Sequence, residues 1–186
     1  MFKLVILDRD GVINYDSDNY IKSADEWQPL PGSIEAIARL TKAGFDVCIA
    51  TNQSGLARGY FDINALHEMH HKMIQLVEEQ GGRIVKIEFC PHAPEDNCYC
   101  RKPKPGLYQH ILSCYPDINP AHVFAVGDSL RDLEAAVTAG CPPILVRTGK
   151  GERTLAKGGL PDNTIIVDDL KAAALHIIYE ENVPED

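Results

Sequence analysis

Acidic side chains follow two apolar segments of this sequence, and their spacing suits metal-assisted chemistry. Asp8 and Asp10 come directly after the apolar run 2–7, and Asp128 follows the apolar run 123–126. Carboxylates gathered at one site repel one another unless a cation neutralises them, and a small number of hard oxygen ligands suits Mg²⁺ completed by water and phosphate oxygens. Alone, each aspartate would more often be a helix cap or a turn former. Together they predict a magnesium site that receives a phosphate group.

The elements that must bring these residues together alternate between strands and helices. Short β-branched runs indicate buried strands, and the spacing of Ile34, Ile37 and Leu40 gives one apolar helix face. This alternation predicts an α/β fold of three layers (αβα) around a parallel, Rossmann-like sheet with right-handed crossovers. Because ligands bind beyond the carboxyl ends of such strands, the residues that follow the first, second and fourth strands should meet. We expect strands over residues 2–7, 45–50, 84–89, 123–126, 144–146 and 164–167, and helices over 31–44, 62–80, 106–114, 130–139 and 168–179.

A second group of residues has the spacing of a zinc site. The pattern C-x-H-x₅-C-x-C supplies three thiolates and one imidazole, which is a closed tetrahedral ligand set of structural type. The segment 90–106 contains four prolines and no periodic pattern, so a bound metal ion would be needed to order it. The alternative is that the three cysteines are reduced thiols in a proline-rich loop. Zinc would also fix the neighbouring Arg101 and Lys102 as a phosphate-binding pair. The predicted zinc ligands are Cys90, His92, Cys98 and Cys100.

Length, composition and charge narrow the possible partners. The 186 residues fit one domain over 1–186, with the zinc loop at 90–100 and no segment long enough for a large cap domain. Eighteen basic against 27 acidic residues give a net charge of −9, which disfavours nucleic acid and anionic lipid as partners. The apolar run 2–7 is too short for a signal peptide or a membrane span, so we expect a cytoplasmic protein, and we expect it to be a monomer.

Four segments in order resemble the haloacid dehalogenase (HAD) superfamily of phosphohydrolases. LDRDGVIN resembles the first motif of that family, hhhDxDG, and GDSLRD at 127–132 resembles the fourth. Thr51 at the end of the second strand resembles the second motif, and Lys102 resembles the lysine of the third. The resemblance covers nearly the whole chain. It implies a HAD-like fold and a magnesium-dependent phosphatase.

The resemblance also implies roles for these residues. Asp8 would attack phosphorus and form an aspartyl phosphate, while Asp10 would protonate the leaving oxygen and then activate water. Mg²⁺ would be held by the Asp8 carboxylate, the Asp10 backbone carbonyl and Asp128. Thr51 and Lys102 would stabilise the transferring phosphoryl group. Asp132 would hold the site residues in place without contacting the substrate itself.

The zinc loop followed by RKPKPG resembles the histidinol-phosphate phosphatase branch of the superfamily. Within that branch, residues 51–61 (TNQSGLARGYF) and 100–107 (CRKPKPGL) resemble the heptose 1,7-bisphosphate 7-phosphatases. The implied reaction is removal of the C7 phosphate of that sugar, on the way to ADP-heptose and the lipopolysaccharide core. Histidinol phosphate is the alternative substrate, and a zinc-stabilised binding module without activity is a third possibility, disfavoured by the intact Asp8 and Asp10. Candidate substrate-binding residues are Arg9, Asp16, Ser17, Asn19, Tyr20, Asn52, Gln53, Ser54, Arg101 and Ser129.

Three further patterns are interpreted as structural. Residues 67–71 match H-E-x-x-H of zinc proteases, but no convincing third ligand follows, so we expect a solvated helix face. Residues 149–151 (GKG) lack the spacing of a P-loop and are predicted to form a flexible surface loop. Cys48, Cys114 and Cys141 are predicted to be small core residues.

Overall fold

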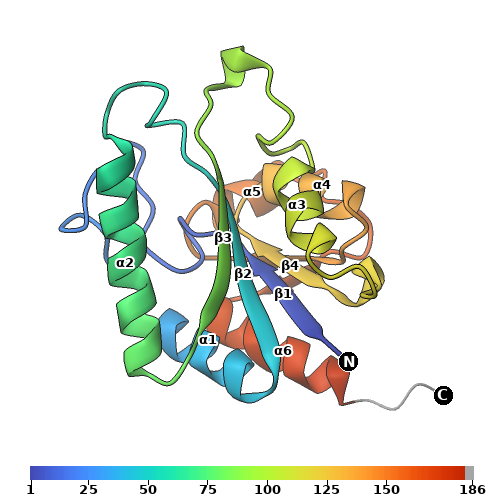
Figure 1. The fold of residues 1–186 in the computed structure, drawn as a ribbon. Helices are drawn as coiled ribbons and strands as arrows, with labels where there is room; N and C mark the ends of the chain where they lie inside the picture. Colours follow the sequence, from blue (N-terminus) through green and yellow to red (C-terminus); the bar gives the residue numbers. More distant parts are fainter. Residues whose placement is uncertain (183–186) are drawn as a thin grey trace.

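A six-stranded parallel sheet forms the centre of the protein, as the computed structural model of residues 1–182 shows (Figure 1). The strand order is β3-β2-β1-β4-β5-β6, so β1 lies in the middle and the order reverses beside it. In a parallel sheet this reversal is where a crevice opens beyond the carboxyl ends of the strands. The strands are β1 (Lys3–Leu7), β2 (Phe45–Asn52), β3 (Ile84–Cys90), β4 (Phe124–Gly127), β5 (Pro143–Val146) and β6 (Ile165–Val167).

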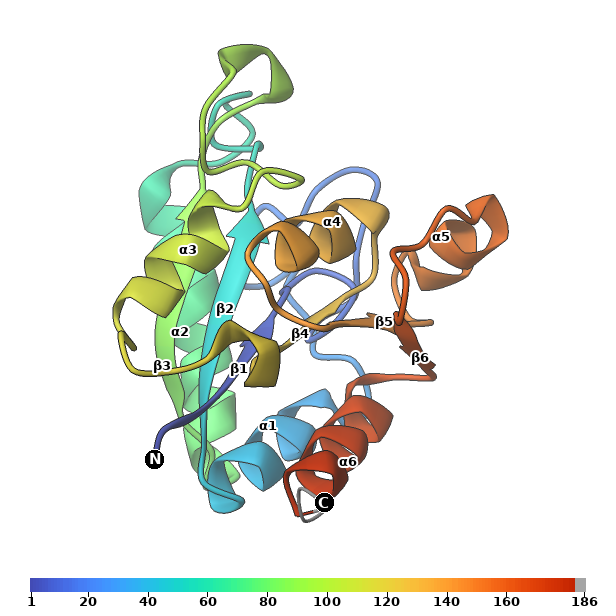
Figure 2. The same cartoon turned by 90° about the vertical axis from the view of Figure 1, so that its right-hand side faces the viewer.

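Helices cover both faces of this sheet (Figure 2). Side chains alternate along β1: Val5 and Leu7 pack with α1, α2 and α6, whereas Leu4 and Ile6 pack with α3 and α4. The predicted three-layer α/β fold is therefore confirmed. Within residues 1–182, none of the helices combines the length and the apolar character that a bilayer-spanning segment requires. The helices are α1 (Ser33–Lys42), α2 (Ile63–Glu79), α3 (Gly106–Ser113), α4 (Leu130–Thr138), α5 (Gly151–Lys157) and α6 (Leu170–Glu181), with 3₁₀ turns at Pro94–Asp96 and Pro120–His122.

Two long connections leave the carboxyl ends of the strands. The segment between β1 and α1 is anchored by Trp27, which is fully buried, and by Lys72 of α2, whose Nζ donates to the carbonyls of Ala24 and Trp27 at 2.8 and 2.6 Å. The segment between β3 and α3 contains the cysteine cluster and rises above the sheet in Figure 1. Both connections return to the crevice beside β1, and together with the β2–α2 turn they form its walls.

Two details differ from the sequence prediction. Residues 149–151 are not a flexible loop, because Gly151 is buried and begins α5, a seven-residue helix too short to show an apolar period. Cys114 is exposed at the end of α3, so its assignment to the core is wrong, whereas Cys48 and Cys141 are buried as predicted. The apolar residues next to Cys114 in the sequence suggested a core position, but they do not determine the direction of a side chain at the end of a helix.

Truncating the inward face of α1 should lower stability. Ile37 is fully buried between α1 and the sheet, so Ile37→Ala should reduce the free energy of unfolding by about 2–5 kcal/mol through lost burial and a residual cavity. Arg39→Ala, on the exposed face of the same helix, should change it by less than about 0.5 kcal/mol. Urea denaturation of both variants measures the difference, and equal effects would contradict this packing.

Candidate active site

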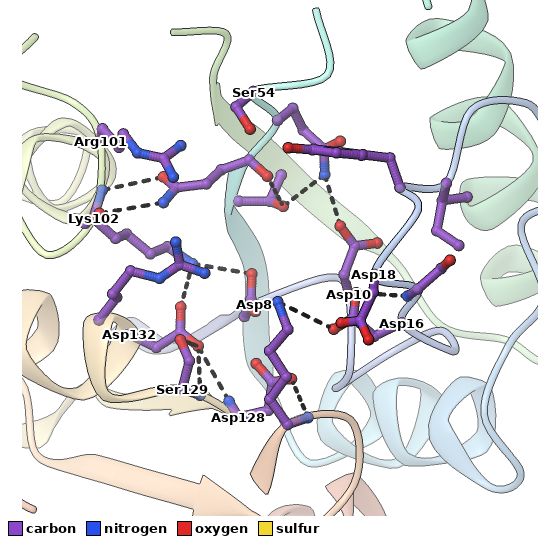
Figure 3. A pocket seen from close by; sticks show the side chains of 18 of the residues that line it. Asp8, Asp10, Asp16, Asp18, Ser54, Arg101, Lys102, Asp128, Ser129 and Asp132 are labelled. Atoms are coloured by element: carbon purple, nitrogen blue, oxygen red, sulfur yellow. Dashed lines mark hydrogen bonds and ion pairs between the residues drawn. The ribbon is translucent and has the colours of Figure 1, made fainter. Parts of the chain in front are cut away.

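A cavity of about 230 Å³ lies in the crevice beyond the carboxyl ends of β1, β2 and β4 (Figure 3). Most of the residues predicted to act there line it together. Arg9 and Asn19 are not among the lining residues, and Arg9 is fully buried. The predicted residues that line the cavity are Asp8, Asp10, Asp16, Ser17, Tyr20, Thr51, Asn52, Gln53, Ser54, Arg101, Lys102, Asp128, Ser129 and Asp132.

Three carboxylates lie close together in this cavity, and a buried lysine contacts two of them. Oxygens of Asp8, Asp128 and Asp132 lie within 4.8 Å of one another. Lys102, 1% exposed, places its Nζ 3.0 Å from Asp8 Oδ1 and 2.8 Å from Asp132 Oδ1 (Figure 3). One lysine leaves this group of acids with an excess of negative charge. A hard divalent cation is what such a set of oxygens binds.

Burial and the excess of carboxylates over cations determine the pKa values of these groups. Burial, followed by the charge of Asp132, raises the pKa of Asp8 to about 7, although Lys102 opposes the shift. Burial and the charge of Asp8 raise the pKa of Asp128 well above its usual value. Burial also acts on Asp132, but Lys102 outweighs it and lowers the pKa of that carboxyl. Asp8 and Asp128 are therefore the carboxylates left to be neutralised, and the donor set fits Mg²⁺.

Asp10 is only two residues from Asp8, yet its carboxylate has other partners. Its Oδ1 accepts from Arg9 Nε and Nη2 at 3.0 and 2.8 Å and from Asn14 Nδ2 at 2.8 Å, while Oδ2 accepts from Gln53 Nε2 at 3.0 Å. Burial alone would raise the pKa of Asp10, but the charge of Arg9 and these hydrogen bonds lower it. Asp10 therefore lines the cavity with a set of hydrogen-bond partners different from that of Asp8.

The loop after β4 is fixed by the segment that begins α5. Lys150 N donates to Asp128 Oδ2 at 2.9 Å, and Thr154 Oγ1 donates to the Asp128 carbonyl at 2.8 Å. Gly11 and Gly149 meet at this point: a Cβ on Gly11 would lie 2.0 Å from Asp128 Oδ2, and one on Gly149 would lie 2.4 Å from the Gly11 Cα. Both glycines have positive φ angles, so larger residues are excluded by conformation as well as by space. The segment interpreted as a surface loop therefore holds a metal-site carboxylate in place.

The side-chain amide of Asn52 joins the end of β2 to the zinc loop. Asn52 Nδ2 donates to the Lys102 carbonyl at 3.3 Å, and Lys102 N donates to Asn52 Oδ1 at 3.1 Å. On the other side of the lysine, Asp132 Oδ2 accepts from the amides of Asp128 and Ser129 and from Ser129 Oγ. These contacts fix Lys102 from its backbone to its ammonium group.

Cationic side chains surround the opening of the cavity. Arg58, Arg101, Arg131 and Lys150 line it. Burial and the like charge of Arg131 lower the pKa of Arg101, whose Nη1 donates to the His92 carbonyl at 3.4 Å. Guanidinium groups close enough to repel one another provide a site for an anion.

Several lining residues were not predicted from the sequence, although some of them have a local sequence signal. Arg131 lies inside the GDSLRD motif, so the spacing could have indicated it. Lys150 follows β5, and the rule that ligands gather beyond strand ends could have included that strand. The pairs Lys150–Asp16 and Arg153–Asp18, each 3.5 Å, attach the loop after β1 to α5 and depend on tertiary packing alone. The missed residues are Asp18, Ile21, Arg58, Arg131 and Lys150.

The predicted zinc ligands converge at one end of the β3–α3 connection. The Sγ atoms of Cys90 and Cys98 are 3.5 Å apart, those of Cys98 and Cys100 are 3.7 Å apart, and His92 Nδ1 lies 3.6 and 3.4 Å from Cys90 and Cys100. A tetrahedral Zn²⁺ with bonds of about 2.3 Å to sulfur and about 2.0 Å to nitrogen requires ligand separations of about 3.5–3.8 Å. The cluster therefore has the dimensions of a structural zinc site.

The H-E-x-x-H segment forms no metal site among residues 1–182. His67 and His71 are exposed on α2 and belong to neither cluster of candidate metal ligands found there. His70 between them is buried, and its Nε2 lies 3.1 Å from Arg9 Nη1. The expectation of a solvated face is right for His67 and His71 and wrong for His70.

Comparisons with known proteins agree with this geometry. A protein-family model described as HAD-hydrolase-like matches residues 99–173. The chain is 57% identical over 176 residues to the D-glycero-β-D-manno-heptose-1,7-bisphosphate 7-phosphatase of Pseudomonas putida, covering 95% of this chain and 99% of that one. It is 50% identical to the enzyme of the same name from Neisseria meningitidis over 185 residues, 98% of each chain.

A solved structure is similar over nearly the whole chain. The D,D-heptose 1,7-bisphosphate phosphatase of B. bronchiseptica, complexed with magnesium and phosphate, superimposes with a TM-score of 0.94 at 56% identity, over 96% of this chain and 99% of that one. The corresponding phosphatase of Burkholderia thailandensis gives a TM-score of 0.75 at 48% identity, over 95% of this chain and 98% of that one.

Metal analysis tests the cysteine cluster. The purified protein should contain about one zinc per chain, and Cys98→Ser should lose most of it because three ligands do not close a structural tetrahedron. Cys114→Ser, at an exposed cysteine outside the cluster, should retain the metal. Elemental analysis after gel filtration measures all three proteins. Zinc-free wild-type protein, or zinc retained in full by Cys98→Ser, would contradict the assignment.

Proposed function

Because this chain belongs to the family of D-glycero-D-manno-heptose-1,7-bisphosphate 7-phosphatases within the HAD-like hydrolases, we propose that it hydrolyses the C7 phosphate of that bisphosphate with Mg²⁺. The observation that supports this most is the cluster of Asp8, Asp128 and Asp132 with Lys102 at the point where the strand order reverses. The relatives reported above favour the sugar bisphosphate over histidinol phosphate as the substrate.

Asp8 is the nucleophile in this proposal. One oxygen of its carboxylate attacks phosphorus, the bond between phosphorus and the C7 oxygen breaks, and an aspartyl phosphate forms. When bound by Asp8, Asp128 and the Asp10 carbonyl, Mg²⁺ supplies the positive charge that lets an anionic carboxylate approach an anionic phosphate. Lys102 is held on Asp8 Oδ1 and supplies a further positive charge, and Thr51 adds a hydroxyl donor at the end of β2.

Asp10 moves the protons. In its protonated form it gives its proton to the departing C7 oxygen, and the carboxylate left behind then takes a proton from the water that attacks the aspartyl phosphate. That attack releases inorganic phosphate and restores Asp8 and the protonated Asp10. The position of its carboxylate supports this role, because Oδ1 is occupied by Arg9 and Asn14 whereas Oδ2 has a single partner, Gln53. Oδ2 is the oxygen available for proton transfer.

The second phosphate of the substrate would bind at the cationic opening of the cavity. Arg101 is fixed by its neighbour His92 in the zinc loop, so a rigid guanidinium faces the opening. The polar residues around the cavity, which offer hydroxyl, amide and carboxylate groups, would bind the sugar hydroxyls. They are Asp16, Ser17, Tyr20, Asn52, Gln53, Ser54 and Ser129.

We further propose that the chain acts as a single-domain monomer in the cytoplasm and binds neither nucleic acid nor membranes. The net charge of −9 supports the lack of polyanionic partners. The cysteines clustered in the segment 90–100 have metal-ligand spacing, which is typical of proteins in a reducing compartment. Its product, a heptose 1-phosphate, is suited to nucleotide activation, which would place the reaction in ADP-heptose and lipopolysaccharide core biosynthesis.

Removing the nucleophile tests the reaction class. Asp8→Asn should lower kcat by at least about a thousandfold, because an amide cannot form the aspartyl phosphate. Asp25→Asn, an exposed aspartate on the same connection, should leave kcat unchanged. Phosphate release with and without Mg²⁺ measures both. Turnover that survives in Asp8→Asn would show that the nucleophile is another residue.

Comparing substrates tests the specificity. The wild-type kcat/KM should be higher for heptose 1,7-bisphosphate than for heptose 7-phosphate or histidinol phosphate. Arg101→Gln should lower kcat/KM for the bisphosphate by roughly 10–100-fold, the worth of a charge-assisted hydrogen bond, and affect the two monophosphates much less. Arg83→Gln, at an exposed arginine outside the cavity, is the control. A preference for histidinol phosphate, or equal losses for all three substrates, would refute the proposed specificity.

A further inference from the structure

The arginine between the two catalytic aspartates is buried, although it bears a charge. Arg9 is 0% exposed, and its donors are divided between two elements. Nε and Nη2 bind Asp10 Oδ1 at 3.0 and 2.8 Å, and Nη1 lies 3.1 Å from Nε2 of His70 on α2. A guanidinium out of water needs a partner for its donors, since a buried donor without one costs about 1–3 kcal/mol, and more for a charged group. His70 provides a partner for Nη1, which does not contact Asp10.

The direction of the contact fixes the state of the histidine. An arginine side chain has donors and no acceptor, so Nε2 of His70 must be the acceptor and the ring proton must lie on Nδ1. Burial and the charge of Arg9 lower the pKa of His70 to about 3, although Asp10 opposes the shift, so the ring is neutral. The ring is 6% exposed and lies against Phe89 of β3, with 6.4 Å between ring centroids. The imidazole is therefore a neutral hydrogen-bond acceptor, and its packing against β3 fixes its position.

From this geometry we propose that His70 is a positioning residue for the reaction: by accepting from Arg9 Nη1, it fixes the guanidinium that orients the Asp10 carboxylate. Arg9 and Asn14 together take Oδ1, which leaves Oδ2 on the side of Gln53 and Thr51. Without the contact to His70, the Arg9 guanidinium could turn away from Asp10. The Asp10 carboxylate could then rotate, and Oδ2 would no longer point toward the substrate. The proposal rests on the proposed function, because it assigns Asp10 the proton transfers.

Two substitutions separate positioning from packing. His70→Leu keeps an apolar body of similar size and removes the acceptor, and it should lower kcat roughly 10–100-fold, as the loss of a residue supporting a catalytic group does, while KM changes by less than about threefold. His70→Gln supplies an amide oxygen near the place of Nε2 and should restore kcat to within about threefold of wild type. If His70→Leu fails to fold, His70→Met replaces it as the variant without a comparable acceptor.

Matched controls lie on the same helix. His67→Leu makes the same change at an exposed histidine and should leave kcat unaltered. Val77→Ala removes a buried apolar contact of α2 away from Arg9 and should lower the unfolding temperature without lowering kcat. Wild-type-like kcat in His70→Leu, or a folded His70→Gln no more active than His70→Leu, would overturn the proposal.

The tautomer gives a measurement that needs neither substitution nor activity. In ¹⁵N-histidine NMR spectra at neutral pH, His70 should show a protonated Nδ1 and an unprotonated Nε2, and a proton on Nε2 would overturn the proposal. Failure of the proposed function is distinguishable, because wild-type protein would then release phosphate from neither the heptose bisphosphate nor p-nitrophenyl phosphate. An active wild-type enzyme with an active His70→Leu variant would refute only the role of His70.

Discussion

The excess of negative charge at the end of β1 is the constraint on which the rest of the structure depends. Asp8, Asp128 and Asp132 come within 4.8 Å of one another in a buried place, and Lys102 neutralises only part of their charge. Water is largely excluded there, so the remaining charge is costly until a cation arrives. Each neighbouring segment either contributes a charged side chain to this group of carboxylates or fixes the position of one. The same excess of negative charge favours a divalent cation, whose positive charge would in turn attract a phosphate group.

Bringing a lysine to Asp8 from 94 residues away along the chain explains the cysteine cluster. Lys102 follows an irregular connection, and a lysine on an irregular segment would ordinarily sample many positions, at an entropic cost to each contact. Four metal ligands in the segment 90–100 fix the connection without secondary structure, and the paired hydrogen bonds with Asn52 attach it to β2. Zinc bound by these four ligands would thus fix the positions of Arg101 and Lys102.

The sequence was informative where local patterns determine structure. The six strands, the helices other than α5, the four motifs and the metal spacing could be predicted. Strand ends place Asp8, Thr51 and Asp128 at one edge of the sheet. Three features were not. Lys150 and Gly149 reach Asp128 through a close backbone approach that no local pattern marks, and Arg9 looks like a substrate ligand until its burial is seen. His70 lies in a misleading H-E-x-x-H match, and its partner is 61 residues distant. These are contacts between elements, which depend on how the helices dock.

Two aspartates separated by one residue can perform different chemistry because the chain gives them different partners. Asp8 faces other carboxylates, which raise its pKa to about 7 together with burial, whereas Arg9, Asn14 and Gln53 overcome burial and lower the pKa of Asp10. The two carboxylates therefore differ in proton affinity, because the groups around them differ. Arg9 stands between them in the sequence, and its Nε and Nη2 donate to the Asp10 carboxylate. Lys102 contacts Asp8, whereas the Asp10 carboxylate is bound by Arg9, Asn14 and Gln53.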